Sequence, residues 1–115
     1  MLPLSEEKRR AVRVPVNLPA RILQGNHEYE GKMLNLSTAG IFLKSSHLLD
    51  AGDLVHLSFS IPGSADPMQI KSRVVWGGSM EGPVSRTYAM GIHFESLTAG
   101  EQETLSAYIQ NLLNA

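Results

Sequence analysis

The chain has 115 residues, of which 43% are hydrophobic and none is cysteine, and its formal net charge is −1 at pH 7. This length suits a single domain that buries roughly two thirds of the surface of its unfolded chain. The missing cysteines exclude disulfides, thiol catalysis and thiolate metal sites, and the slightly negative charge disfavours a general nucleic-acid binder. Neither a membrane-spanning run nor a secretory signal is recognisable, so we expect a cytoplasmic protein.

Positive charge is concentrated at the N-terminus. Residues 1–21 carry five basic and two acidic side chains, whereas the remaining residues carry five basic and nine acidic ones. A basic segment on a mildly acidic body suits a small anion better than a long polyanion, whose binding needs many phosphate contacts. We therefore expect a flexible basic arm over residues 1–13.

Three strands are expected in the first half of the chain. Pro15 and Pro19 punctuate residues 13–23, which favours an extended, irregular or edge strand. A Gln-Gly-Asn turn signal then leads into a second strand over residues 27–34, and a third follows over residues 39–44.

Three further strands are expected over residues 54–61, 68–76 and 86–95. The first of them shows the clearest alternation of apolar and polar residues, which is typical of a strand with one buried face. In the second, Trp76 shares the two-residue period of Ile70 and Val74, which predicts that its side chain packs in the core.

The C-terminal segment changes to a helical period. Thr98 and Glu101 form a capping box at its start, and the apolar residues that follow make one stripe: Leu105, Ile109, Leu112 and Leu113. Six short strands and one helix predict a six-stranded antiparallel β-barrel over residues 14–97, plugged or flanked by a helix over residues 98–115.

The sequence is poor in catalytic patterns. Its four histidines are scattered without metal-ligand spacing, and His56 and His93 fall opposite the apolar rows of their strands, where we expect solvent. There is no phosphate-cradling loop and no dinucleotide fingerprint. We therefore expect neither an enzyme nor a metal site, and no cofactor.

Two segments point instead to a binding function. Arg9, Arg10 and Arg13 offer planar, permanently charged groups that grip phosphates or purine edges with two hydrogen bonds and stack on rings. Residues 35–40, Asn-Leu-Ser-Thr-Ala-Gly, supply short hydrogen-bonding side chains and then a glycine, where a backbone can approach a ligand closely. Together they predict a site for a compact, anionic, ring-bearing molecule.

These two segments resemble the signature of the PilZ domain family, bacterial receptors for cyclic di-GMP. That signature is R-x-x-x-R near the start of the domain and [D/N]-x-S-x-x-G some twenty residues later, and residues 9–13 and 35–40 match every fixed position. The family has a six-stranded antiparallel barrel with a C-terminal helix. The resemblance therefore implies the same fold that the periodicity predicts.

The resemblance also implies roles for individual residues. Arg9 and Arg13 would bind guanine and phosphate of the dinucleotide, which is chemically sensible because guanine O6 and N7 match an arginine fork. Asn35 and Ser37 would hydrogen-bond the second guanine or nearby polar atoms, and Gly40 would leave room for the ring.

Three residues are weaker candidates, and several have plainer explanations. Lys8 and Arg10 could add phosphate or stacking contacts, and Trp76 could line the site from the barrel rim. Alternatively, the basic arm is a solvated terminus, and residues 35–40 form a turn that satisfies its own backbone, with the glycine at a bulge or left-handed position.

The resemblance implies a stand-alone receptor that binds cyclic di-GMP, orders its arm and regulates an unidentified protein effector in motility, exopolysaccharide or biofilm control. We expect a monomer or weak dimer with no DNA or RNA partner. One alternative is a ligand-independent adaptor that binds only proteins. A less favoured one is a small-barrel binder of single-stranded nucleic acid, which would need exposed aromatic residues in basic grooves.

Overall fold

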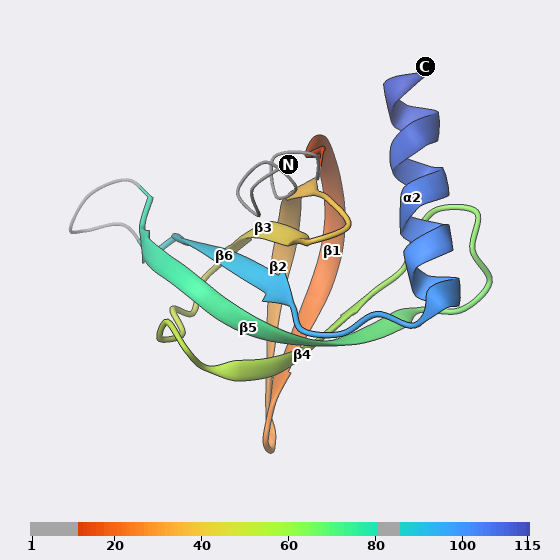
Figure 1. Ribbon diagram of the computed structural model, residues 1–115. Helices are drawn as coiled ribbons and strands as arrows, with labels where there is room; N and C mark the ends of the chain where they lie inside the picture. The colour runs from red at the N-terminus through yellow and green to blue at the C-terminus, as the bar shows by residue number, and fades with distance from the viewer. Residues whose placement is uncertain (1–11, 81–85) are drawn as a thin grey trace, which may run out of the picture.

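The computed structural model describes residues 12–80 and 86–115, which form six strands and one helix (Figure 1). All neighbouring strands run antiparallel, as predicted. The elements are β1 (Val14–Gln24), β2 (His27–Leu36), β3 (Gly40–Ser45), β4 (Leu54–Phe59), β5 (Met68–Ser79), β6 (Tyr88–Phe94) and α2 (Ala99–Leu113).

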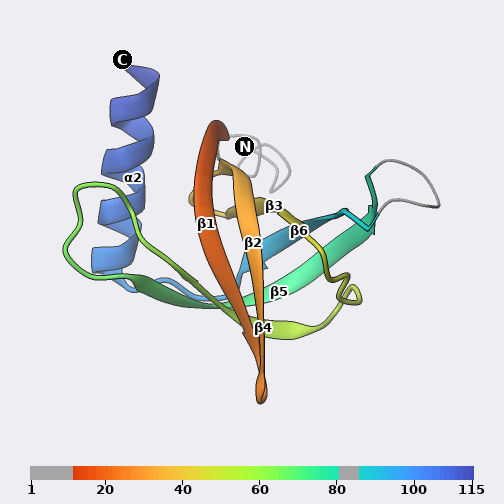
Figure 2. The ribbon, with the colours of Figure 1, turned by 180° about the vertical axis from the view of Figure 1, so that it is seen from behind.

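The strands close into a barrel in the order β1-β2-β3-β6-β5-β4. The pairing of β1 with β4, which closes the barrel, is short. It extends only from the pair Arg21–Ser58 to the pair Leu23–His56. Figures 1 and 2 show β1 and β2 as a long hairpin that extends beyond the other strands. Its tight turn places Gly25 at a φ of 59°, a left-handed conformation that glycine adopts without steric cost.

Alternate side chains fill the barrel interior. In β4, Val55, Leu57 and Phe59 are buried while His56 is exposed, which is the predicted alternation. His93 in β6 is also exposed, as predicted.

The helix α2 contributes to the core through one part of its length. The predicted capping box is present, since Glu101 N donates to Thr98 Oγ1 at 3.1 Å and Thr98 N donates to Glu101 Oε1 at 2.9 Å. Leu105 and Ile109 are buried, but Leu112 and Leu113 are 37% and 50% exposed. The predicted apolar stripe thus packs only over its first half, and Figure 2 shows the end of α2 projecting away from the barrel.

A β-bulge in β5 changes which residues face outward. The register between β5 and β6 shifts between Val74 and Trp76, so that Val75 has no direct partner on β6. Val74 is fully buried, whereas Trp76 is 46% exposed. The prediction that Trp76 packs in the core is therefore wrong, because the extra residue moves its side chain to the outer face.

Candidate functional site

One row of outward-facing positions crosses four strands of the barrel. Asn35 on β2 is paired with Phe42 on β3, Phe42 with Gly91 on β6, and Gly91 with Trp76 on β5. Directly paired residues lie on the same face of a sheet, so these four residues share one continuous strip of the outer wall. We call this strip the platform.

Asn35 connects the platform to the N-terminal motif. Its Oδ1 accepts a hydrogen bond from Arg13 Nη1 at 3.2 Å and another from the backbone N–H of Phe42 at 3.1 Å. Because both partners are donors, the amide oxygen must face them, and the amide NH₂ remains available as a donor. The two predicted motifs, 22 residues apart in the chain, thus meet at one side chain.

Ser37 is fully buried and holds the turn between β2 and β3. Its Oγ accepts hydrogen bonds from the backbone N–H groups of Ala39 and Gly40 at 3.0 and 3.2 Å. The backbone N–H of Ser37 also donates to the carbonyl of Gly40 at 3.0 Å. The plainer explanation of Ser37 as a turn residue therefore describes its contacts in this structure.

Gly40 is required by close packing between strands. A Cβ atom at this position would collide with the carbonyl oxygen of Ile92 and lie 3.1 Å from the Cα of His93. Gly40 is absent from the glycines with positive φ, so the left-handed alternative is wrong. The glycine lets β3 begin directly against β6, which sets the position of Asn35 and Phe42 at the start of the platform.

The other end of the platform is aromatic. The rings of Trp76 and Phe42 lie with their centroids 5.3 Å apart at an interplanar angle of 41°. Between them, Gly91 has no side chain, and a Cβ there would collide with the indole of Trp76. Trp76 therefore lies across β6 toward Phe42 and presents an exposed aromatic surface on the same outer wall as Asn35.

Sequence reasoning did not identify Phe42 and Gly91 as part of this surface. A signal for each was present, since Phe42 alternates with Ile41 and Leu43, which predicts that it faces outward. Gly91 stands between Met90 and Ile92 in the interior of a strand, where a glycine often marks close approach of another group.

Three predicted site residues, Lys8, Arg9 and Arg10, lie outside the described residues. Arg13 is described and exposed. Arg9 precedes Arg13 by four residues, which is at most about 14 Å of extended chain. Of the predicted arginines, the structure thus places only Arg13, at Asn35 in the platform.

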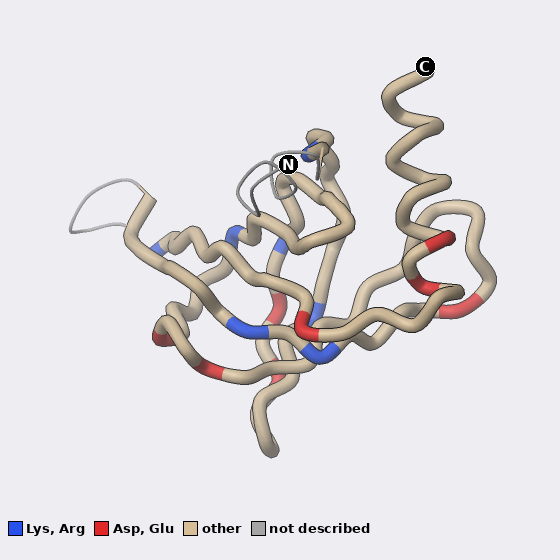
Figure 3. The backbone as a smooth tube through the Cα atoms, viewed as in Figure 1, with Lys and Arg blue, Asp and Glu red and all other residues tan. Residues whose placement is uncertain are grey.

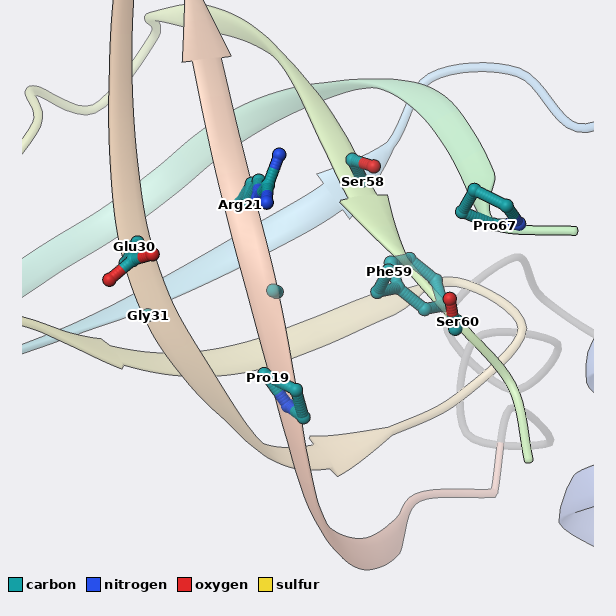
Figure 4. Close-up of a pocket in the computed structure, with 9 residues that line it drawn as sticks. Pro19, Arg21, Glu30, Gly31, Ser58, Phe59, Ser60 and Pro67 are labelled. Atoms are coloured by element: carbon teal, nitrogen blue, oxygen red, sulfur yellow. The ribbon is translucent and has the colours of Figure 1, made fainter.

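A cavity in another part of the described chain contains no motif residue. It has a volume of about 540 Å³ and is lined mainly by β1 and the end of β4, where these two strands separate (Figure 4). Arg21, Ser58 and Phe59 line it, and none of the predicted site residues does. The motif residues instead form an open surface on the barrel wall.

Within residues 12–80 and 86–115, no three histidine, cysteine or acidic side chains gather in a way that could hold a metal ion. In the same part of the chain, no helix is long and apolar enough to cross a membrane.

The fold and the platform define a small antiparallel barrel with polar and aromatic side chains in one strip of its outer wall. The family model of the PilZ domain matches residues 7–111, and the chain therefore belongs to the PilZ domain family. This confirms the resemblance seen in the sequence. A search of curated proteins found no significant match.

Solved structures share the fold. The PilZ domain of YcgR from Escherichia coli, solved with c-di-GMP, has a TM-score of 0.75 at 12% identity, with 93% of this chain and 92% of that chain covered. The Bacillus subtilis inhibitor of motility MotI/DgrA has a TM-score of 0.73 at 24% identity, with 92% of this chain and 52% of that chain covered. The K. pneumonia MrkH–c-di-GMP complex has a TM-score of 0.74 at 15% identity, with 92% and 52% covered. This chain thus spans about half the length of the last two.

Proposed function

We propose that this chain is a receptor for cyclic di-GMP and binds the nucleotide on the platform. The observation that carries the proposal is the 3.2 Å hydrogen bond between Arg13 and Asn35, because it joins the two motifs on the same strip as the half-buried ring of Phe42 and the exposed ring of Trp76. Membership of the PilZ family supports the proposal, as do the YcgR and MrkH structures solved with c-di-GMP.

The exposed groups of the platform match the chemistry of a guanine nucleotide. Arg13 uses one N–H on Asn35 and keeps other donors for the O6 and N7 acceptors of guanine. The free NH₂ of Asn35 donates to a second acceptor of the nucleotide. The indole of Trp76 stacks on a base, a contact worth about 1–3 kcal/mol for each base.

Ser37 and Gly40 act in this proposal by fixing the turn that positions Asn35. Both are buried, and their hydrogen bonds and close packing hold the start of β3 against β6. Their role at the site is therefore to keep the platform in shape for the ligand.

The N-terminal arm closes over the bound nucleotide. Arg9 contacts guanine or phosphate, and Lys8 and Arg10 add further phosphate contacts. Fixing about five residues costs on the order of 5–10 kcal/mol in backbone entropy, whereas one charge-assisted hydrogen bond returns about 1.5–3 kcal/mol. Ordering thus needs several contacts with the ligand together, and it creates a new surface for a protein effector.

Isothermal titration calorimetry tests the binding step. We expect cyclic di-GMP to bind at micromolar or lower concentration, while cyclic di-AMP and GTP bind at least tenfold more weakly. Adenine offers an amino group in place of O6, and GTP lacks the second purine. Absence of heat and of a thermal shift with cyclic di-GMP would contradict the proposal and favour the ligand-independent adaptor.

Amide hydrogen exchange tests the closing step. Protection of residues 5–13 should rise when cyclic di-GMP is added and stay unchanged when cyclic di-AMP is added. Equal exchange in both states, with binding confirmed by calorimetry, would contradict closure of the arm and leave the binding proposal intact.

A further inference from the structure

Two lysines face each other across neighbouring strands on the outer wall. Lys32 on β2 is directly paired with Lys44 on β3, and both side chains are exposed. Like charges at directly opposed positions of a sheet destabilise it. In the same region, Figure 3 shows two basic positions close together where β2 and β3 run side by side. An anion bound between the two ammonium groups would relieve this repulsion.

Ion pairing in the described part of the chain leaves the two lysines unneutralised. Arg21 and Arg73 each form an ion pair, with Glu28 at 3.8 Å and Glu95 at 3.1 Å, but neither lysine forms an ion pair with a described carboxylate. A shallow cavity of about 290 Å³ is lined by both lysines, by Ser46 and by the exposed residue Glu30, so two positive charges and one negative charge border it. Space and positive charge therefore coincide at this point.

The lysine pair adjoins the platform. Lys44 follows Phe42 by two residues on β3, a separation of about 7 Å along a strand, and faces the same side of the sheet. The positions next to Lys44 on the outer wall are Ala89 and then Gly78. A Cβ at Gly78 would meet no atom within 4 Å, whereas Ala89 is only 7% exposed, so Gly78 is the open position between the lysines and Trp76.

From this geometry we infer that Lys32 and Lys44 form an anion subsite that binds a phosphodiester group of the cyclic dinucleotide. The inference rests on the proposed function. A nucleotide with one base on Trp76 extends past Gly78 and places a phosphate beside the two ammonium groups. The lysines thereby add electrostatic attraction that Arg13 and the arm do not provide.

Charge-neutral variants test this inference. Cyclic di-GMP affinity is measured by calorimetry at two or more salt concentrations for Lys32→Gln, Lys44→Gln and the double variant. Each single change should weaken binding about two- to fivefold, and the double change about tenfold. The double variant should also lose part of the salt dependence of binding, because fewer charges attract the ligand. Its melting temperature without ligand should stay equal or rise, since the repulsion is gone.

Lys71→Gln is the matched control, because Lys71 is an exposed lysine on β5 that is paired with His56 and lies away from the platform. It should bind like the wild-type protein. If the wild-type protein and Lys71→Gln bind cyclic di-GMP and the double variant binds equally well, the anion subsite is overturned while the receptor function stands. If the wild-type protein does not bind, the proposed function fails, and the subsite fails with it.

Discussion

The indole of Trp76 occupies the space where Gly91, its direct partner on β6, would carry a Cβ atom. A methyl group at position 91 would collide with three indole atoms, Nε1, Cε2 and Cδ1. The missing side chain thus lets the ring lie across β6 toward Phe42. Gly91 is a positioning residue for the aromatic part of the platform.

Gly91→Ala should therefore displace Trp76 and weaken cyclic di-GMP binding. The expected loss is about 1–3 kcal/mol, at least about fivefold in affinity, which is the usual contribution of stacking on one base. Trp76 is the only tryptophan of the chain, so its fluorescence reports the displacement directly. Gly100→Ala, in the first turn of α2, is the control and should change neither fluorescence nor affinity. Unchanged fluorescence in Gly91→Ala would show that the ring does not depend on this contact.

Arg13→Ala should weaken cyclic di-GMP binding tenfold or more and change the melting temperature little. Arg13 is exposed and contacts the barrel through the hydrogen bond to Asn35, so it contributes little to folding. Arg13→Lys should also bind poorly, because an ammonium group cannot make the planar two-bond contact. Calorimetry compares both variants with the control Arg21→Ala. Arg21 is an exposed arginine on β1 that pairs with Glu28. Wild-type affinity in both Arg13 variants would remove Arg13 from the site.

The positions of the strands along the chain and of the helix were predictable because their local signals agree with the tertiary packing. In β4 the alternation of Val55, Leu57 and Phe59 matches a strand with one buried face. At the start of α2, Thr98 and Glu101 form the capping box that their spacing indicates. Such signals depend on neighbouring residues alone, so one sequence suffices to detect them.

The position of Trp76 was not predictable from the same kind of signal. Val74, Val75 and Trp76 form a continuous apolar run, and a run without alternation does not determine which residues face inward. A single extra residue in one strand moves every following side chain to the other face. The role of Ser37 was equally open, since a serine in a turn and a serine in a ligand site look identical in sequence. Its burial in the structure reveals the turn contacts.

Ser37→Ala should lower the free energy of unfolding by about 1–3 kcal/mol, because it leaves two backbone N–H groups in the turn without their acceptor. Urea denaturation followed by circular dichroism measures this change. Ser106→Ala on the exposed side of α2 is the control and should stay within about 0.5 kcal/mol of the wild-type protein. If Ser37→Ala is as stable as Ser106→Ala, the turn does not depend on the hydroxyl, and a direct ligand contact becomes the better explanation of this residue.

The two halves of the apolar stripe on α2 should respond differently to truncation. Leu105 is fully buried against the barrel, so Leu105→Ala removes core contacts, leaves a cavity and should cost about 2–5 kcal/mol of unfolding free energy. Leu113 is 50% exposed near the end of the helix, and Leu113→Ala should change stability by no more than about 0.5 kcal/mol. Urea denaturation measures the free energy of unfolding of both variants. The two variants carry the same Leu→Ala change, one at a buried position and one at an exposed position. Equal losses would mean that the end of α2 packs against the protein in solution as tightly as its middle.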